Sequence, residues 1–120
     1  MFTVKVSCQF DAAHFLRNYE GKCANLHGHT WTVVVYLKVS EVNQIGISVD
    51  FQEVRNALEP VIQQIDHHLL NDIEPFKTKE NPSAENIARW IFRKLRPHLP
   101  DIHQVEVYES PTCSVLYNED

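Results

Sequence analysis

Cysteines are few in this sequence, and long apolar runs are missing. Three cysteines among 120 residues, an odd number at irregular spacing, fit reduced thiols better than a disulfide framework. No apolar run is long enough to cross a bilayer. The start, Met1 to Val6, alternates like a strand and lacks the continuous apolar region of a signal peptide. We therefore expect a cytoplasmic protein.

Positive charge is also scarce. The chain has 11 Lys and Arg against 16 Asp and Glu, for a net charge of −5, and its basic residues are scattered. Nucleic acid is therefore not an expected partner, because phosphate binding needs a basic face. A small anionic substrate in a locally positive pocket stays compatible with this charge. With no repeat, linker or low-complexity segment, the length indicates one domain over residues 1–120, small enough that oligomerisation would help its stability.

Two long segments alternate as strands do. From Phe2 to His14, apolar residues take every second position, and His14 ends the more apolar face. The alternation returns from His27 to Val39, where His27 and His29 begin the more apolar face. Residues 17–26 show no period and contain Asn and Gly, which indicates a loop.

A helical pattern follows. Asp50 with Glu53 three residues later resembles a capping box. Apolar residues at helical spacing then predict a helix from Phe51 to Leu69, in which Pro60 removes one backbone hydrogen bond.

The last third of the chain predicts a second helix and two strands. The helix begins within residues 81–85, with Ser83 or Asn81 as its cap, carries an apolar stripe from Ala84 to Leu95 and is stopped by Pro97. The strands cover residues 103–109 and 113–117. The predicted order is strand, strand, helix, helix, strand, strand, which is an α+β fold.

Three histidines at strand positions suit a metal ion. Side chains two apart on a strand share a face, so His27 and His29 can offer two nitrogens to one ion, and Gly28 removes bulk from the opposite face. His14 can supply a third nitrogen if its strand pairs antiparallel with theirs. Three histidines leave one coordination position open, as in catalytic zinc sites. The sequence therefore predicts a zinc site at His14, His27 and His29.

Cys23, four residues before His27, is the candidate reactive group. In one interpretation it is a catalytic thiol on a loop held by rigid strands. In the other it is a fourth ligand that closes a structural zinc site. The two differ in their consequence, because Cys23→Ala keeps the zinc only if Cys23 is catalytic.

Two acidic positions also draw attention. Glu109 shares a face of its strand with Val105 and Val107, so it points to the buried side and needs a partner, such as two parallel N–H donors of a ligand. Alternatively, it emerges into water at the strand end. Asp66 and His67 end the predicted first helix, where neighbours point about 100° apart and need not bond each other. They either polarise a group from elsewhere or form a polar helix end.

Taken in order, these segments resemble the family of 6-pyruvoyl-tetrahydropterin and 6-carboxy-5,6,7,8-tetrahydropterin synthases. The resemblance covers nearly the whole chain and rests on Phe10-Asp11-Ala12-Ala13-His14, Cys23 followed after three residues by His27-Gly28-His29, Asp50-Phe51, Asp66-His67 with Leu70-Asn71, and Tyr108-Glu109. The three-residue gap after Cys23 is that of the carboxy branch, whereas the animal pyruvoyl branch typically has five. Ser110-Pro111 departs from the family, in which a threonine is common, and can reshape the pterin pocket.

The resemblance implies a tunnelling fold, a four-stranded antiparallel sheet with two helices. Subunits of this fold pair their sheets into a barrel, usually as a homohexamer of two stacked trimers with active sites at subunit contacts. The matching site residues are His14, His27 and His29 for zinc, Cys23 as the catalytic cysteine, Asp66 and His67 as its acid–base partners, and Glu109 as the pterin anchor. The implied enzyme is a lyase that converts 7,8-dihydroneopterin triphosphate to 6-carboxy-5,6,7,8-tetrahydropterin, acetaldehyde and triphosphate, on the way to queuosine and other deazapurines.

Three other functions stay open. The pyruvoyl synthase reaction on the same substrate would keep all side-chain carbons on the pterin. A zinc hydrolase using metal-bound water would not need Cys23. A non-enzymatic, zinc-stapled interaction protein would have no open coordination position and would unfold with a chelator.

Overall fold

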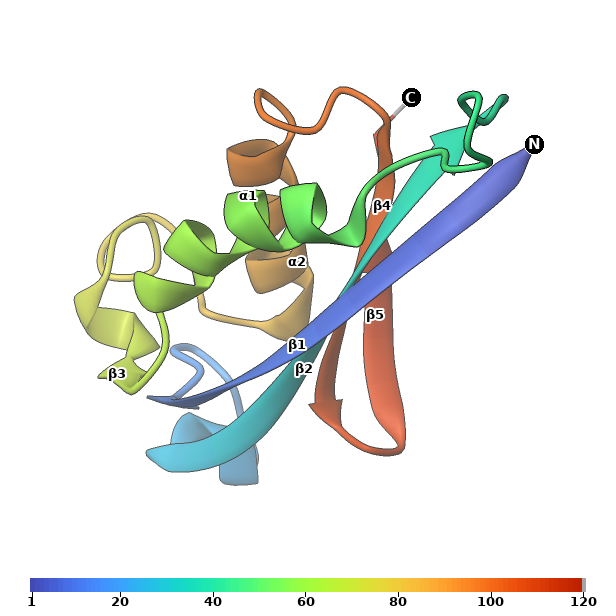
Figure 1. Cartoon of the computed structure of the whole chain (residues 1–120). Helices are drawn as coiled ribbons and strands as arrows, with labels where there is room; N and C mark the ends of the chain where they lie inside the picture. Colours follow the sequence, from blue (N-terminus) through green and yellow to red (C-terminus); the bar gives the residue numbers. More distant parts are fainter. Residues whose placement is uncertain (120) are drawn as a thin grey trace.

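The computed structural model describes residues 1–119, which form one sheet and two helices (Figure 1). The elements are β1 (Phe2–His14), β2 (His27–Val39), α1 (Phe51–Gln63), β3 (His68–Leu69), α2 (Ala84–Leu95), β4 (Ile102–Ser110) and β5 (Cys113–Tyr117), with short 3₁₀ turns at Lys22–Ala24 and Leu70–Asp72. The strands lie in the order β3-β1-β2-β4-β5. Within residues 1–119, neither helix is long and apolar enough to cross a membrane.

The core lies between the two helices and one face of the sheet. That face is the one predicted from the alternation, since Phe10 on β1 and Trp31 and Val33 on β2 are buried there. Leu58 of α1 and Ile91 of α2 are buried in the same cluster. The helices therefore cover the apolar face, at whose margin the histidines of β1 and β2 begin or end the pattern.

The sheet differs from the predicted four-stranded antiparallel arrangement by one strand. β3 has only two residues and pairs in parallel with β1, Ala12 with His68 and Ala13 with Leu69. The sheet is therefore five-stranded and mixed. A two-residue strand is too short to show any alternation, which is why the sequence pattern did not reveal it. The four long strands begin and end within one residue of the predicted positions.

The prediction that the first helix runs to Leu69 is wrong. Pro60 lies inside α1 as expected, but the helix ends at Gln63. Ile65 is fully buried, so the apolar spacing continues after the helix has given way to tighter turns. His67 then takes a left-handed conformation, with φ 59°, and the chain turns back toward β1.

β2 and β4 separate at one end of the sheet. Their pairing runs from Leu37 and Ile102 to Thr32 and Tyr108 and, in the described chain, stops there. Past this point β2 continues along β1, and β4 continues along β5. We call this division the fork. Its two arms, β1–β2 and β4–β5, diverge in the lower half of Figure 1.

Candidate metal centre and active site

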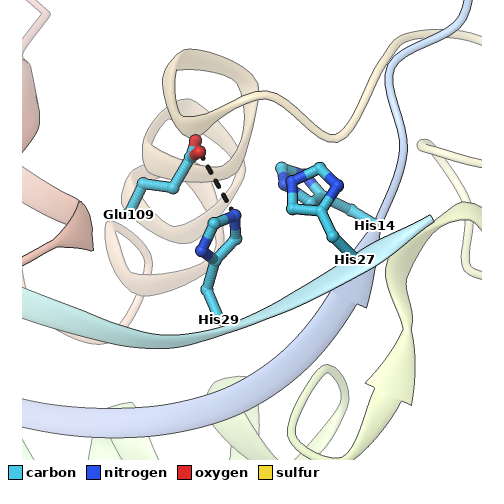
Figure 2. Close-up of side chains that lie close together, drawn as sticks. All are labelled: His14, His27, His29 and Glu109. Carbon is cyan, nitrogen blue, oxygen red and sulfur yellow. Dashed lines mark ion pairs between the residues drawn. The ribbon is translucent and has the colours of Figure 1, made fainter. Parts of the chain in front are cut away.

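Three histidine rings meet at the end of the β1–β2 arm. His14 and His27 are direct partners in the antiparallel ladder, and His29 lies two residues further along the same face. The ring centroids are 4.6 Å apart for His14 and His27, 4.7 Å for His27 and His29, and 5.2 Å for His14 and His29. The antiparallel pairing that a third nitrogen from His14 requires is therefore present, and Figure 2 shows the three rings close together.

The three rings present unpaired nitrogens to one another. The Nε2 atoms of all three histidines are buried and have no hydrogen-bond partner among residues 1–119. His14 Nδ1 lies 2.7 Å from the Pro82 carbonyl oxygen, and His27 Nδ1 lies 2.6 Å from that of Asn25. Each of these Nδ1–H groups donates, which leaves the Nε2 lone pair free for a metal. Because an unsatisfied buried polar atom costs about 1–3 kcal/mol, three facing one another fit a bound metal ion.

Burial also keeps two of these rings neutral. It lowers the pKa of His14 and of His29, because desolvation disfavours the charged imidazolium. The Pro82 carbonyl beside His14 and the Glu109 carboxylate beside His29 act in the opposite direction but are smaller causes. Neutral imidazole is the form that binds zinc, so these rings suit a metal at neutral pH.

A fourth donor reaches the cluster from the other arm of the fork. Glu109 Oε1 lies 3.2 Å from His29 Nε2 (Figure 2). The donor atoms of Glu109 and the three histidines all lie within 4.8 Å of one another. The contact with His29 shows that Glu109 points toward the histidines of β1 and β2, as its position in the strand predicts. Its partner within the chain is a histidine, and its side chain remains 31% exposed.

Cys23 lies in the predicted loop, in the 3₁₀ turn Lys22–Ala24. Its thiol is partly exposed and free. Among the residues that the structure describes, it does not belong to the group formed by the three histidines and Glu109. This arrangement favours a reactive thiol over a fourth ligand that closes the site.

Asp66 and His67 form a second group, with Asp11 of β1. On a helix the two would point apart, but the helix has ended, and His67 Nδ1 lies 2.9 Å from Asp66 Oδ1. Asp66 Oδ1 also accepts from the Asp11 N–H at 3.0 Å, and the His67 N–H donates to the Asp11 carbonyl at 2.6 Å. The bond from Asp11, assisted by His67, lowers the pKa of Asp66. The pair is therefore an ionised carboxylate that orients an imidazole.

This pair lies outside the histidine cluster. Asp11 N and O both bond to it, so the pair occupies the edge of β1 that faces away from β2. Its His67 ring is mostly exposed. Within one chain, the predicted acid–base pair and the three predicted zinc ligands therefore belong to separate groups.

Two asparagines hold the loop that links the cluster to Cys23. Asn71 Oδ1 accepts from Phe15 N and its Nδ2 donates to Phe15 O, both at 3.0 Å. Asn81 makes the same two bonds to Arg17, both at 2.9 Å. Between them, Leu16 N donates to the Cys23 carbonyl at 2.8 Å.

The sequence did not predict this role for either asparagine. Asn71 stood out only as part of a motif, and Asn81 only as a candidate helix cap, a role that Ser83 fills. The only signal in the sequence was an asparagine directly after the apolar pair Leu69-Leu70.

Two pockets open beside His29. One, of about 580 Å³, is lined by Thr32, Tyr108 and Glu109 among others. The second, of about 540 Å³, includes Asp11 and His67. Both share Gly28, His29 and Thr30 as lining residues. A small molecule therefore has room next to the candidate metal ligands.

Comparisons with known proteins find related sequences and a related structure. A family model described as 6-pyruvoyl tetrahydropterin synthase matches residues 3–120. A 6-carboxy-5,6,7,8-tetrahydropterin synthase from Synechocystis sp. is 36% identical over 123 residues, which cover 98% of this chain and 93% of that protein. A dihydroneopterin monophosphate aldolase from Pyrococcus furiosus is 36% identical over 91 residues, 76% of this chain and 72% of that protein.

A solved structure shares the whole fold. The 6-pyruvoyl tetrahydropterin synthase of Caenorhabditis elegans superposes with a TM-score of 0.88 at 28% identity, covering 99% of this chain and 96% of that one. This likeness confirms the predicted α+β tunnelling fold.

Proposed function

This chain belongs to the 6-pyruvoyl tetrahydropterin synthase family, and from that premise we propose that it is a zinc-dependent lyase that makes 6-carboxy-5,6,7,8-tetrahydropterin from 7,8-dihydroneopterin triphosphate. The observation that carries the proposal is the set of three buried Nε2 atoms without hydrogen-bond partners among residues 1–119. Similarity to the Synechocystis enzyme and the three-residue gap between Cys23 and His27 support the carboxy product.

His14, His27 and His29 would hold the metal ion. A bound zinc ion supplies Lewis acidity to the oxygens of the substrate's side chain. Two of these rings are oriented by hydrogen bonds from Nδ1, that of His14 to the Pro82 carbonyl and that of His27 to the Asn25 carbonyl. This outer support fixes the rings before any metal or substrate arrives.

Cys23 would act as the base on the substrate's side chain. As a thiolate it takes a proton from a side-chain carbon, and protonation of the ring reduces the dihydropterin to the tetrahydro level while that carbon is oxidised. Triphosphate leaves by elimination, and one water is added as the adjacent carbon–carbon bond breaks, which leaves a carboxyl group on the pterin and releases acetaldehyde. Its loop is joined to the end of β1 through Leu16. The thiol is therefore carried on the segment that directly follows His14.

His67 would be the complementary acid or base, oriented by Asp66. Because this pair lies outside the histidine group, we propose that it completes the site of a neighbouring subunit. The edge of β1 from Phe2 to Phe10 pairs with no strand among residues 1–119, so it is available to pair with another copy. The enzyme would then be a homo-oligomer, which we propose to be a hexamer of two trimers.

Glu109 would anchor the pterin. A carboxylate accepts two parallel N–H bonds, and the amino and ring N–H groups of a pterin offer that pair. The pocket of about 580 Å³ next to Glu109 gives the ring system its place. This contact orients the side chain of the substrate toward the three histidines.

We place the enzyme in the cytoplasm, on a route to deazapurines such as queuosine. The three cysteines are free, which suits a reducing compartment.

Product identification tests the proposal. Zinc-loaded protein is incubated with 7,8-dihydroneopterin triphosphate, and the products are identified by mass spectrometry. We expect acetaldehyde, triphosphate and the 6-carboxy pterin. A pyruvoyl pterin as the product would instead identify a 6-pyruvoyl-tetrahydropterin synthase. Turnover of dihydroneopterin monophosphate alone would identify an aldolase like the Pyrococcus relative.

A matched variant separates the rival mechanisms. Cys23→Ala should keep the zinc and lose turnover. Full activity without the thiol would assign a hydrolase that uses metal-bound water. Loss of the zinc in Cys23→Ala would make Cys23 a structural ligand.

A further inference from the structure

We propose that Glu109 is a fourth, displaceable ligand of the metal ion and joins the two arms of the fork when no pterin is bound. The inference rests on the metal site of the proposed function. It gives Glu109 a role before the substrate binds, in addition to that of pterin anchor.

The separation of Glu109 from His29 is that of two ligands of one ion. Two donors that each lie about 2.0–2.1 Å from a tetrahedral zinc ion are about 3.3 Å apart. Glu109 Oε1 and His29 Nε2 are 3.2 Å apart. The contact is not a hydrogen bond, because His29 Nε2 has no hydrogen-bond partner among residues 1–119. The Glu109 oxygen and the His29 nitrogen therefore both face the position that a metal ion would occupy, and no N–H of His29 donates to the carboxylate.

Glu109 brings this oxygen from the opposite arm. Tyr108 and Thr32 are the last residues that pair between β4 and β2, and Glu109 follows directly on the β4–β5 arm. Figure 2 shows its side chain pointing across toward His29, while the three rings come from β1 and β2. A metal ion held by all four residues would therefore link the arms at the point where their backbones separate.

The same carboxylate is free to leave. Its side chain is 31% exposed and borders the pocket of about 580 Å³ with Ser110 and Pro111. A pterin in that pocket offers two N–H donors to the two carboxylate oxygens and so competes with the metal. Substrate binding would thus vacate a coordination position at the moment when the substrate's own oxygens need it. In the free enzyme, four protein ligands would bind the metal more tightly than three.

Metal affinity without substrate tests the fourth ligand. The protein is titrated with zinc against a chromogenic chelator, as wild type and as Glu109→Gln, which keeps the shape but removes the charge. We expect the variant to bind zinc at least about tenfold more weakly. Glu106→Gln is the matched control, because Glu106 lies on the same strand but bonds to Tyr36 and Ser114 outside the group. Its zinc affinity should equal that of the wild type.

Spectroscopy and hydrogen exchange test the displacement and the link. With cobalt in place of zinc, the visible spectrum of the wild type should change on adding unsubstituted pterin, and Glu109→Gln should show that changed spectrum from the start. Metal should slow amide exchange in β4 and β5 of the wild type but not of the variant.

The outcomes separate the two proposals. Equal zinc affinity and equal cobalt spectra in wild type and Glu109→Gln would overturn the fourth ligand and leave the product assay untouched. Failure of the wild type itself to bind zinc or cobalt would overturn the metal site, and the proposed zinc-dependent function with it.

Discussion

Two histidines that burial or partial burial keeps neutral, His14 and His29, tie the stability of the metal-free protein to pH. Burial lowers the pKa of His14 and His29 from an ordinary value of 6.5. The unfolded chain then binds more protons than the folded one as the pH falls below that value, so stability is lost over this range. We expect the free energy of unfolding to decrease from about pH 7.5 to about pH 5.5 in urea titrations with a chelator present. His14→Asn should reduce this decrease, and an unchanged decrease in the variant would contradict it.

Cys8 should be the least reactive of the three thiols. Burial raises its pKa to about 11, since Arg55 offsets only part of the desolvation. At about pH 8 only about one Cys8 side chain in a thousand is then a thiolate. In a timed iodoacetamide reaction followed by peptide mass mapping, exposed Cys113 should be labelled well before Cys8. Equal labelling rates at that pH would contradict the partial burial of Cys8 and the raised pKa that follows from it.

The direction of a side chain could be predicted from the sequence where it depends only on the residue's own strand. Period-two alternation was enough to put His27 and His29 on one face and to point Glu109 inward. Alternation could not predict the 3.2 Å contact between Glu109 and His29, because this contact depends on where β2 and β4 separate. The bond between Asp66 and His67 also depends on a left-handed backbone that no apolar pattern encodes.

At the level of elements, local patterns set the long strands and α2, and tertiary packing decided the rest. The apolar period that predicts a helix to Leu69 is real, since Ile65 is buried. The apolar period shows which side chains are buried, however, and not that they lie on a helix. A chain in tight turns can bury side chains at the same spacing. β3 exists only because the chain returns beside Ala12 and Ala13. Its two residues carry no signal of their own.

The two asparagines act as a substitute for a neighbouring strand. Each pairs with both backbone groups of one loop residue, Asn71 with Phe15 and Asn81 with Arg17. These bonds extend ordered backbone past His14, where β1 ends. The loop that carries Cys23 is thereby held by the segments around Asn71 and Asn81, which are far from it in sequence.

Removing one of these side chains should therefore loosen the Cys23 loop. Asn71 is only 5% exposed, so Asn71→Ala leaves the N–H and C=O of Phe15 unpaired and should destabilise the protein by about 1–3 kcal/mol. Alkylation of Cys23 should also become faster under native conditions. Asn56→Ala, at an exposed position of α1, is the control and should change neither quantity. If Asn71→Ala matches this control in urea unfolding and in labelling, the asparagine does not hold the loop.

At the scale of the whole molecule, one chain does not gather all the candidate residues. The candidate metal ligands lie on the helix-covered face of the sheet, Cys23 lies on a loop, and Asp66 and His67 lie at the outer edge of β1. An acid–base pair at an open strand edge is well placed to reach a second copy that pairs there. No single-chain pattern encodes a site shared between copies, so this prediction depends on the family resemblance alone.

Mixing two inactive variants tests whether subunits share a site. Cys23→Ala and His67→Ala should each be nearly inactive while keeping zinc and oligomer size. If Cys23 and His67 of one site come from different subunits, coexpression at equal levels restores wild-type sites wherever an intact Cys23 meets an intact His67. Random assembly makes this about a quarter of all sites, so about a quarter of wild-type turnover should return. If both residues served the site of their own chain, every site would lack one of them, and the mixed oligomers would stay as inactive as either parent.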